Sequence, residues 1–269
     1  MGMFIPEDKF YNEIDRQTGF NRYKQLIGRN WGDWIRINLL TLLGLIPLVL
    51  GIALSLANSS LLLLLPCALV GGMIYGPFLA CIYDAMLRAM RDDPLPWWTN
   101  YKKAWKQNFR GSLIPGAIVG LIMGLFCFIG MLLWTAQIPP TLVTVLLLLS
   151  SALILTAIFQ QYFTSLVLFD QPALIRLRNM VLFTLLNFKR TFGAALLQLL
   201  YWAVYLLFAP WTLLLLPFIG IWYILFVAEF LLYDRLNESY HIEELIEEAA
   251  SAAENGSAAE NDSGDSKSE

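Results

Sequence analysis

Four polar side chains of this 269-residue chain lie inside long apolar blocks, and these four are the residues best placed to do chemistry. Glu229 is the one ionisable residue clearly embedded in such a block. Gln160 and Gln161 lie roughly 12 to 14 Å along a helix before their block ends, and Gln198 lies about as deep in the next block. All four fall toward the same end of their blocks, so they could meet in the folded protein.

These four residues allow two interpretations. Amides and a carboxylate surrounded by lipid need hydrogen-bond partners, so they could line a shallow, inward-facing polar pocket for a proton, a cation or a small solute. Alternatively, the glutamines bond between helices and only fix their packing. In that second interpretation Glu229 reaches water, or a basic neighbour such as Arg235, near the membrane surface.

The sequence lacks the motifs of the common catalytic, phosphate-binding and metal-binding sites. It contains no glycine-rich phosphate loop, no paired metal ligands, no acid–base set and no GxSxG motif. Cys67, Cys81 and Cys127 all fall in apolar blocks, and His241 is the single histidine, so neither a disulfide framework nor a metal site is indicated. We therefore expect no enzymatic activity and no cofactor.

The elements that position these residues are membrane-spanning helices. Hydrophobic residues make up 58% of the chain, charged residues 14%, and the mean hydropathy is +0.59. A helix of about 20 apolar residues crosses the hydrocarbon core of a bilayer. Four blocks have such a length, and a fifth is a double block divided near Ala209-Pro210: they are Trp34–Ala57, Leu61–Tyr83, Ser112–Trp134, Thr141–Phe169 and Thr191–Tyr233. The expected fold is all-α with six transmembrane helices over residues 34–233.

The charges orient these six spans. Of the 18 Lys and Arg residues, six lie in the N-terminal segment with the edge of the first span, six within 84–111, four within 170–190 and two after the last span. The three opposite connections carry no charge. The positive-inside rule therefore places both termini in the cytoplasm. It also accounts for the basic residues, so no nucleic-acid partner is expected.

The cytoplasmic parts divide into four expected segments. Residues 1–33 form an N-terminal segment with an amphipathic helix, and amphipathic connectors lie near 84–111 and 170–190. A short helix is expected over 234–253. Residues 254–269 are acidic and rich in Ser, Asn and Gly, a composition typical of disorder.

A recurring Asn-aromatic pair suggests an internal repeat. Asn30, Asn108 and Asn187 are each followed by an aromatic residue, at separations of 78 and 79. They predict three units, each made of an interfacial helix, an Asn-aromatic junction and a helical hairpin. Aromatic and basic interfacial segments are also common in multispan proteins without any repeat, so that interpretation stays open.

Three glycines in the third span indicate close helix packing. Gly116, Gly120 and Gly124 recur at intervals of four, which places them on one helix face where a second backbone can approach. The partner is expected to be another helix of the same bundle; the alternative is a second copy of the chain in a homo-oligomer.

Short motifs resemble the YesL family of bacterial membrane proteins. They comprise Ile37-Asn38-Leu39-Leu40 with Pro47 and Gly51, Gly76-Pro77-Phe78-Leu79-Ala80 with Tyr83, Lys102-Lys103-Ala104-Trp105-Lys106-Gln107-Asn108-Phe109, and Asn187-Phe188-Lys189-Arg190. The resemblance covers roughly residues 17 to 235, and the acidic tail departs from it. It implies a family of uncharacterised function, often associated with carbohydrate-uptake and sugar-responsive genes in Gram-positive bacteria. The family supplies no catalytic residue.

The leading hypothesis is an accessory or regulatory membrane component linked to carbohydrate uptake or sensing. Its partners would be the lipid bilayer and membrane transport or sensing proteins. The alternative is a small-solute transporter or channel that uses the polar pocket of Gln160, Gln161, Gln198 and Glu229.

Overall fold

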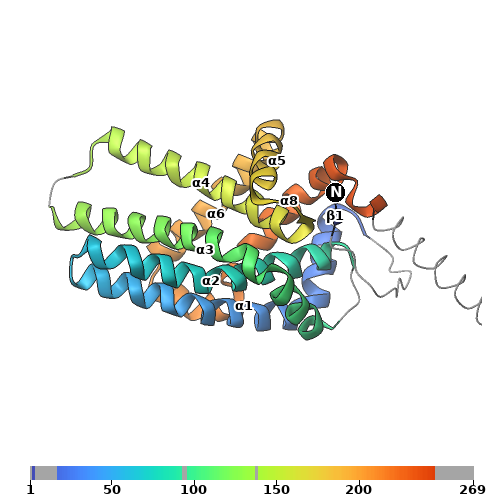
Figure 1. The fold of residues 1–269 in the computed structure, drawn as a ribbon, viewed down its shortest axis with the longest axis horizontal. Helices are drawn as coiled ribbons and strands as arrows, with labels where there is room; N and C mark the ends of the chain where they lie inside the picture. The colour runs from blue at the N-terminus through green and yellow to red at the C-terminus, as the bar shows by residue number, and fades with distance from the viewer. Residues whose placement is uncertain (1, 4–16, 93–95, 137–138, 246–269) are drawn as a thin grey trace, which may run out of the picture.

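The computed structural model describes residues 2–3, 17–92, 96–136 and 139–245, and they form an all-helical bundle (Figure 1). Among these residues the only β-structure is a short antiparallel pair of two-residue strands, β1 (Gly2–Met3) and β2 (Phe169–Asp170). In chain order the helices are α1 Gly19–Ala57, α2 Leu61–Met90, α3 Trp97–Thr135, α4 Leu142–Leu168, α5 Ala173–Leu186, α6 Phe188–Leu207, the 3-10 helix η1 Trp211–Leu215, α7 Leu216–Ile219 and α8 Ile221–Tyr240.

Five of these helices are long and apolar enough to cross a membrane: α1, α2, α3, α4 and α6. The segment Trp211–Ile219 and helix α8 give a sixth candidate if they count as one span, bent by 59°. The bend follows from local sequence, because Pro217 and Gly220 interrupt the regular backbone bonding there. The double block of the sequence is thus divided as expected, but its second half is a broken helix.

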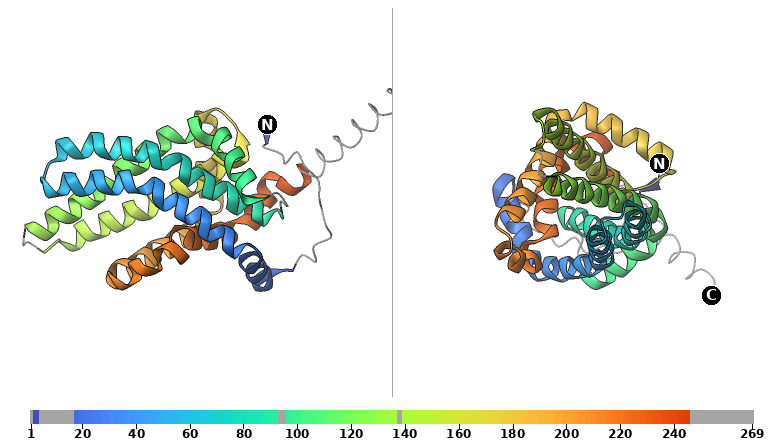
Figure 2. Two further views of the ribbon diagram at one scale, coloured as in Figure 1. Left: turned by 90° about the horizontal axis from the view of Figure 1, so that it is seen from below. Right: turned by 90° about the vertical axis from the view of Figure 1, so that its left-hand side faces the viewer.

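The helices pair into hairpins that share one orientation. The α1–α2 and α3–α4 hairpins lie side by side with their turns at the same end of the bundle (Figure 1). We call this the loop end, and the opposite end, which carries the charged connections, the charged end. The third hairpin, made of α6 and the bent pair, is tilted away from the other two (Figure 2).

The interfacial segments expected before the spans take two forms. In α1 the segment joins the span through a kink at Asn30, whereas in α3 it continues into the span without a break; each of the two elements has 39 residues. At 1.5 Å per residue the 39 residues of α3 extend over roughly 58 Å, well beyond the hydrocarbon thickness. The third segment is a separate helix, α5, which runs across the bundle direction and exposes Leu174, Leu185 and Leu186 (Figure 1).

Packing is uneven along the bundle. Large buried side chains gather toward the charged end and around α8, where Trp34 stacks on Trp222 with ring centroids 5.6 Å apart. By contrast, only 6% of the most apolar window of α4 is buried within the protein. The outer half of α4 therefore projects apolar side chains that only lipid, or another molecule, can cover.

The segments expected near the C-terminus lie partly outside the described residues. Helix α8 continues past Tyr233 to Tyr240, and His241 then adopts a left-handed conformation with φ 50°. Residues 246–253 of the expected short helix, the tail 254–269 and residues 4–16 of the N-terminal segment are not among the described residues.

Candidate functional site

Glu229 lies at the centre of a buried polar cluster. Its side chain is fully buried on α8. Gln160 Nε2 on α4 donates a hydrogen bond to Glu229 Oε1 at 3.2 Å. The hydroxyl of Thr164, one helical turn further along α4, lies 2.8 Å from the same oxygen and 2.9 Å from the backbone oxygen of Gln160. Two residues four apart thus present donors from one face of α4 to a single carboxylate oxygen.

A third helix extends this cluster. Gln198 Nε2 on α6 donates to Gln160 Oε1 at 2.7 Å, and both carboxamides are nearly completely buried. A continuous hydrogen-bonded relay therefore runs from Gln198 through Gln160 to Glu229. The structure brings together these three of the four polar residues singled out in the sequence.

Gln161 is the exception, and it does not join the relay. It lines a small cavity of about 10 Å³ beside Met180 and Tyr240. Its Nε2 is buried and has no hydrogen-bond partner among the described residues. The cause is helix geometry, because adjacent residues point roughly 100° apart around an α-helix and cannot both face α8. Gln161 is therefore removed from the expected pocket.

The expected exit of Glu229 to water or to Arg235 does not form. Arg235 is exposed and pairs with Glu238 at 2.5 Å. Helix α8 continues to Tyr240, about 16 Å of helix beyond Glu229. Tyr83 and Phe163, stacked with centroids 5.6 Å apart, lie on the charged-end side of Gln160. Glu229 Oε2 has no hydrogen-bond partner among the described residues.

A cavity of about 520 Å³ lies beside the relay, at mid-depth of the bundle. Gln160 and Gln198 line it, together with side chains that are mostly apolar. Its walls come chiefly from α3 and α4, through residues such as Val119, Met123, Phe126, Ala152, Leu155 and Phe159. The expected shallow polar pocket is therefore replaced by an apolar cavity with a polar patch at one end. The reason is that the relay groups bond mainly to one another.

Asn38 is a key residue that the sequence reasoning treated only as part of a motif. Its side chain is fully buried and holds the bend of the last span. Asn38 Nδ2 donates to the backbone oxygens of Leu216 and Pro217, both at 2.9 Å. Its Oδ1 accepts from the backbone amides of Ile221 and Trp222, at 3.0 and 3.3 Å. One carboxamide thus provides hydrogen-bond partners for backbone groups on both sides of the break.

Aromatic side chains complete the bonding at this break. The hydroxyls of Tyr201 and Tyr205 on α6 donate to the backbone oxygen of Ile219. Trp222 Nε1 donates to Phe218 O at 2.6 Å. Irregular backbone inside a membrane requires such internal partners. A lone Asn within the first apolar block, with Pro217 and Gly220 in the last, was the signal available in the sequence.

The glycine series of α3 packs against α2 of the same chain. A Cβ added at Gly116 would fall 2.6 Å from Gly76 Cα, and one added at Gly120 would fall 2.6 Å from Gly72 Cα. At Gly124 the nearest atom would be the Cβ of Ala68, at 3.0 Å. The two backbones therefore touch along this face, as in close-packed membrane helices. A homo-oligomer would have to use another surface.

The three junction asparagines share one hydrogen bond. Asn30, Asn108 and Asn187 each donate through Nδ2 to the backbone oxygen four residues earlier, at 3.3, 3.1 and 3.3 Å. Asn30 and Asn187 have non-helical backbone angles and mark a kink and a helix boundary. Helix α3 runs through Asn108 unbroken.

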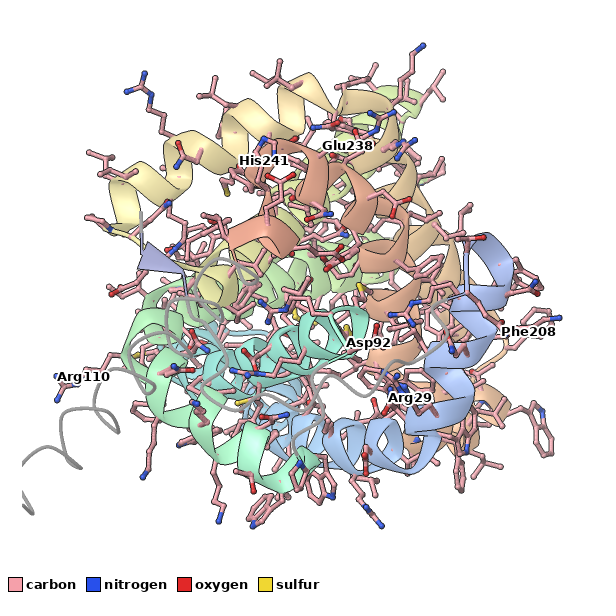
Figure 3. The ribbon with its side chains drawn as sticks, turned by 90° about the vertical axis from the view of Figure 1, so that its right-hand side faces the viewer. Arg29, Asp92, Arg110, Phe208, Glu238 and His241 are labelled. Carbon is pink, nitrogen blue, oxygen red and sulfur yellow. The ribbon has the colours of Figure 1, made fainter. Side chains whose placement is uncertain are left out.

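The charged end holds a separate set of ion pairs. Asp92 pairs with Arg22 at 2.5 Å and with Arg29 at 2.8 Å, tying α1 to the end of α2. Figure 3 looks onto this end and shows Arg29 directed toward Asp92, whereas Arg110 points away from the bundle. Asp84 and Arg88 form a further buried pair at 2.6 Å within α2. The Asp92 pairs thus join α1 to the end of α2, whereas the Asp84–Arg88 pair lies within one helix.

Neither a family model, nor a curated protein, nor a solved structure matches this chain. Among the described residues, no group of three or more His, Cys, Asp or Glu side chains could hold a metal ion. Cys67, Cys81 and Cys127 are free thiols. The relay and the cavity beside it are therefore the site on which a functional argument can rest.

Proposed function

We propose that this protein binds a small lipophilic molecule in the cavity between α3 and α4, and that it acts as an accessory or regulatory membrane component. The observation that carries this proposal is the cavity itself. Its volume of about 520 Å³ falls within the roughly 300–1,000 Å³ of small-molecule sites. Apolar walls with a few converging polar groups are also typical of such sites.

The composition of the cavity argues against a free sugar as the occupant. A sugar presents many hydroxyls, each of which loses free energy if it is buried without a partner. This cavity offers two carboxamides and few other polar groups among mostly apolar side chains. A link to carbohydrate uptake, which the family resemblance implies, would therefore run through a protein partner rather than through this cavity.

Native mass spectrometry of the full chain released from its own membranes tests the proposal. We expect a bound small lipophile that is lost when Ala152, in the cavity wall, is replaced by phenylalanine. Leu146→Phe is the matched control, because Leu146 lies on the same helix with its side chain exposed. A bare wild-type protein, or a ligand retained equally by both variants, would overturn the proposal.

A solute transporter is the second candidate, and the buried carboxylate favours it. Ionisable groups inside membrane proteins often belong to ion or proton pathways. Flux of a solute or of protons into proteoliposomes that disappears in Glu229→Gln would establish this alternative. The relay, however, borders a mostly apolar cavity that the Tyr83–Phe163 stack also lines, so its surroundings among the described residues are largely apolar.

We also propose six spans, both termini in the cytoplasm and three hairpin units. The one-sided distribution of Lys and Arg supports the orientation, and the shared bond of the three asparagines supports the repeat. Cysteine labelling in intact cells tests the orientation. A cysteine at Ser59 should react with an impermeant maleimide, and a cysteine at Lys103 should not; the reverse pattern would refute it.

A further inference from the structure

We infer that the ligand of this cavity carries a hydrogen-bond donor, a hydroxyl or an ammonium group, and that the side-chain oxygen of Gln198 accepts its hydrogen. The inference rests on the proposed function, because it concerns the same cavity. It names the chemical class of the ligand: a single-chain amphiphile with a small donor head group.

The direction of the relay carries the argument. Oε1 of Glu229 accepts hydrogen bonds from the Thr164 hydroxyl and from Nε2 of Gln160, so the NH₂ group of Gln160 faces the carboxyl group. The oxygen of Gln160 then faces Gln198, which must donate its own NH₂ group at 2.7 Å. Each carboxamide is thereby oriented in the same sense by the carboxylate at the end of the chain.

The free end of the relay is consequently an acceptor. Gln198 lines the cavity, and no group of the described residues donates to its side-chain oxygen. Tyr75 and Tyr83 also line the cavity, but a phenol can donate or accept and so does not select the polarity of a ligand. Gln198 is the lining residue whose hydrogen bond to Gln160 leaves a fixed acceptor free.

The residues that line the cavity disfavour a ligand with an anionic head group. None of its lining residues is Lys, Arg or His, so a carboxylate or phosphate head group would find no cation there. The volume of about 520 Å³ suits one alkyl chain with a small head group better than a two-chain phospholipid.

Photoaffinity labelling of the full chain in phosphatidylcholine vesicles tests the inference. The probes are dodecyl chains with a diazirine that differ only in the head group: alcohol, ammonium, methyl ether and carboxylate. We expect the alcohol and the ammonium to label segments 119–127 and 152–163 about fivefold more than the ether, the difference that one hydrogen bond makes. The carboxylate should label least.

Three variants locate the origin of this preference. Gln198→Leu should bring the alcohol-to-ether ratio close to one, and Gln198→Met does the same if the leucine variant does not fold. Glu229→Gln, of nearly the same shape, should lower the ratio because a carboxamide no longer fixes the direction of the relay. Gln161→Leu should leave the ratio unchanged, since Gln161 faces away from the cavity.

The outcomes separate the two proposals. Equal labelling by alcohol and ether, a preference for the ether or the carboxylate, or a ratio unchanged in Gln198→Leu and Glu229→Gln would overturn the inference and leave lipophile binding in place. Failure of every probe to label the two cavity segments would overturn the proposed function together with it.

Discussion

The two sides of α3 differ in how closely they pack against their neighbours. Toward α2, Gly116 and Gly120 let the two backbones touch. Toward α4, side chains such as Met123 and Phe126 line a cavity instead of closing the gap. One side of α3 therefore packs closely against α2 and fixes the fold, and we call it the seam. The other side borders a cavity in which a ligand can bind, and we call it the hollow side.

The largest effect is expected at the seam. Gly120→Leu places a branched side chain where even a Cβ would fall 2.6 Å from Gly72 Cα, so α2 and α3 must separate. We expect a loss of more than about 4 kcal/mol, enough to prevent recovery of folded protein. Size-exclusion chromatography in mild detergent measures it. Gly130→Leu on the same helix, where an added Cβ meets no atom within 4 Å, should behave like the wild type.

The next largest effect is expected at Asn38, which supports the hollow side. Asn38→Leu leaves two backbone oxygens and two backbone amides at the bend without their partner. We expect a loss of about 3 kcal/mol, because each buried unpaired group costs roughly 1–3 kcal/mol and some will find new partners. Thermal unfolding in detergent would show it.

This variant should also loosen the cavity, since Ile221 and Leu225 follow the bend and line it. Asn58→Leu, at the exposed loop end of α1, is the control and should change stability little. Equal unfolding temperatures for the two variants would contradict the role assigned to Asn38.

A smaller and more specific effect separates two neighbours on α4. Gln160→Leu removes a donor from Glu229 and an acceptor from Gln198, so we expect a loss of about 1–3 kcal/mol. Gln161→Leu should be neutral or stabilising, because its buried Nε2 has no partner among the described residues. Unfolding of the two variants side by side tests this, and equal losses would refute the assignment of only one of them to the relay.

The sequence allowed the long apolar helices and the glycine face to be predicted, because the first depend on the length of apolar runs and the second on spacing along one helix. It did not separate Gln160 from Gln161, since that requires knowing which face of α4 meets α8. Nor did it reveal the cavity, whose shape depends on side chains from helices far apart in the chain. The role of Asn38 also escaped prediction, because its partners lie some 180 residues away in the chain.

The smallest effect on stability is expected on the hollow side, and it is the most informative about function. Ala152→Phe fills part of a cavity that apolar side chains line, and added contacts there offset the strain of a larger ring. We therefore expect the free energy of unfolding to change by less than about 1 kcal/mol. Labelling of segments 119–127 and 152–163 by the alcohol probe should nevertheless fall severalfold. A loss of labelling with stability unchanged would separate binding from folding. A loss of both would mean that α4 tolerates a larger side chain at the cavity as poorly as α3 does at the seam.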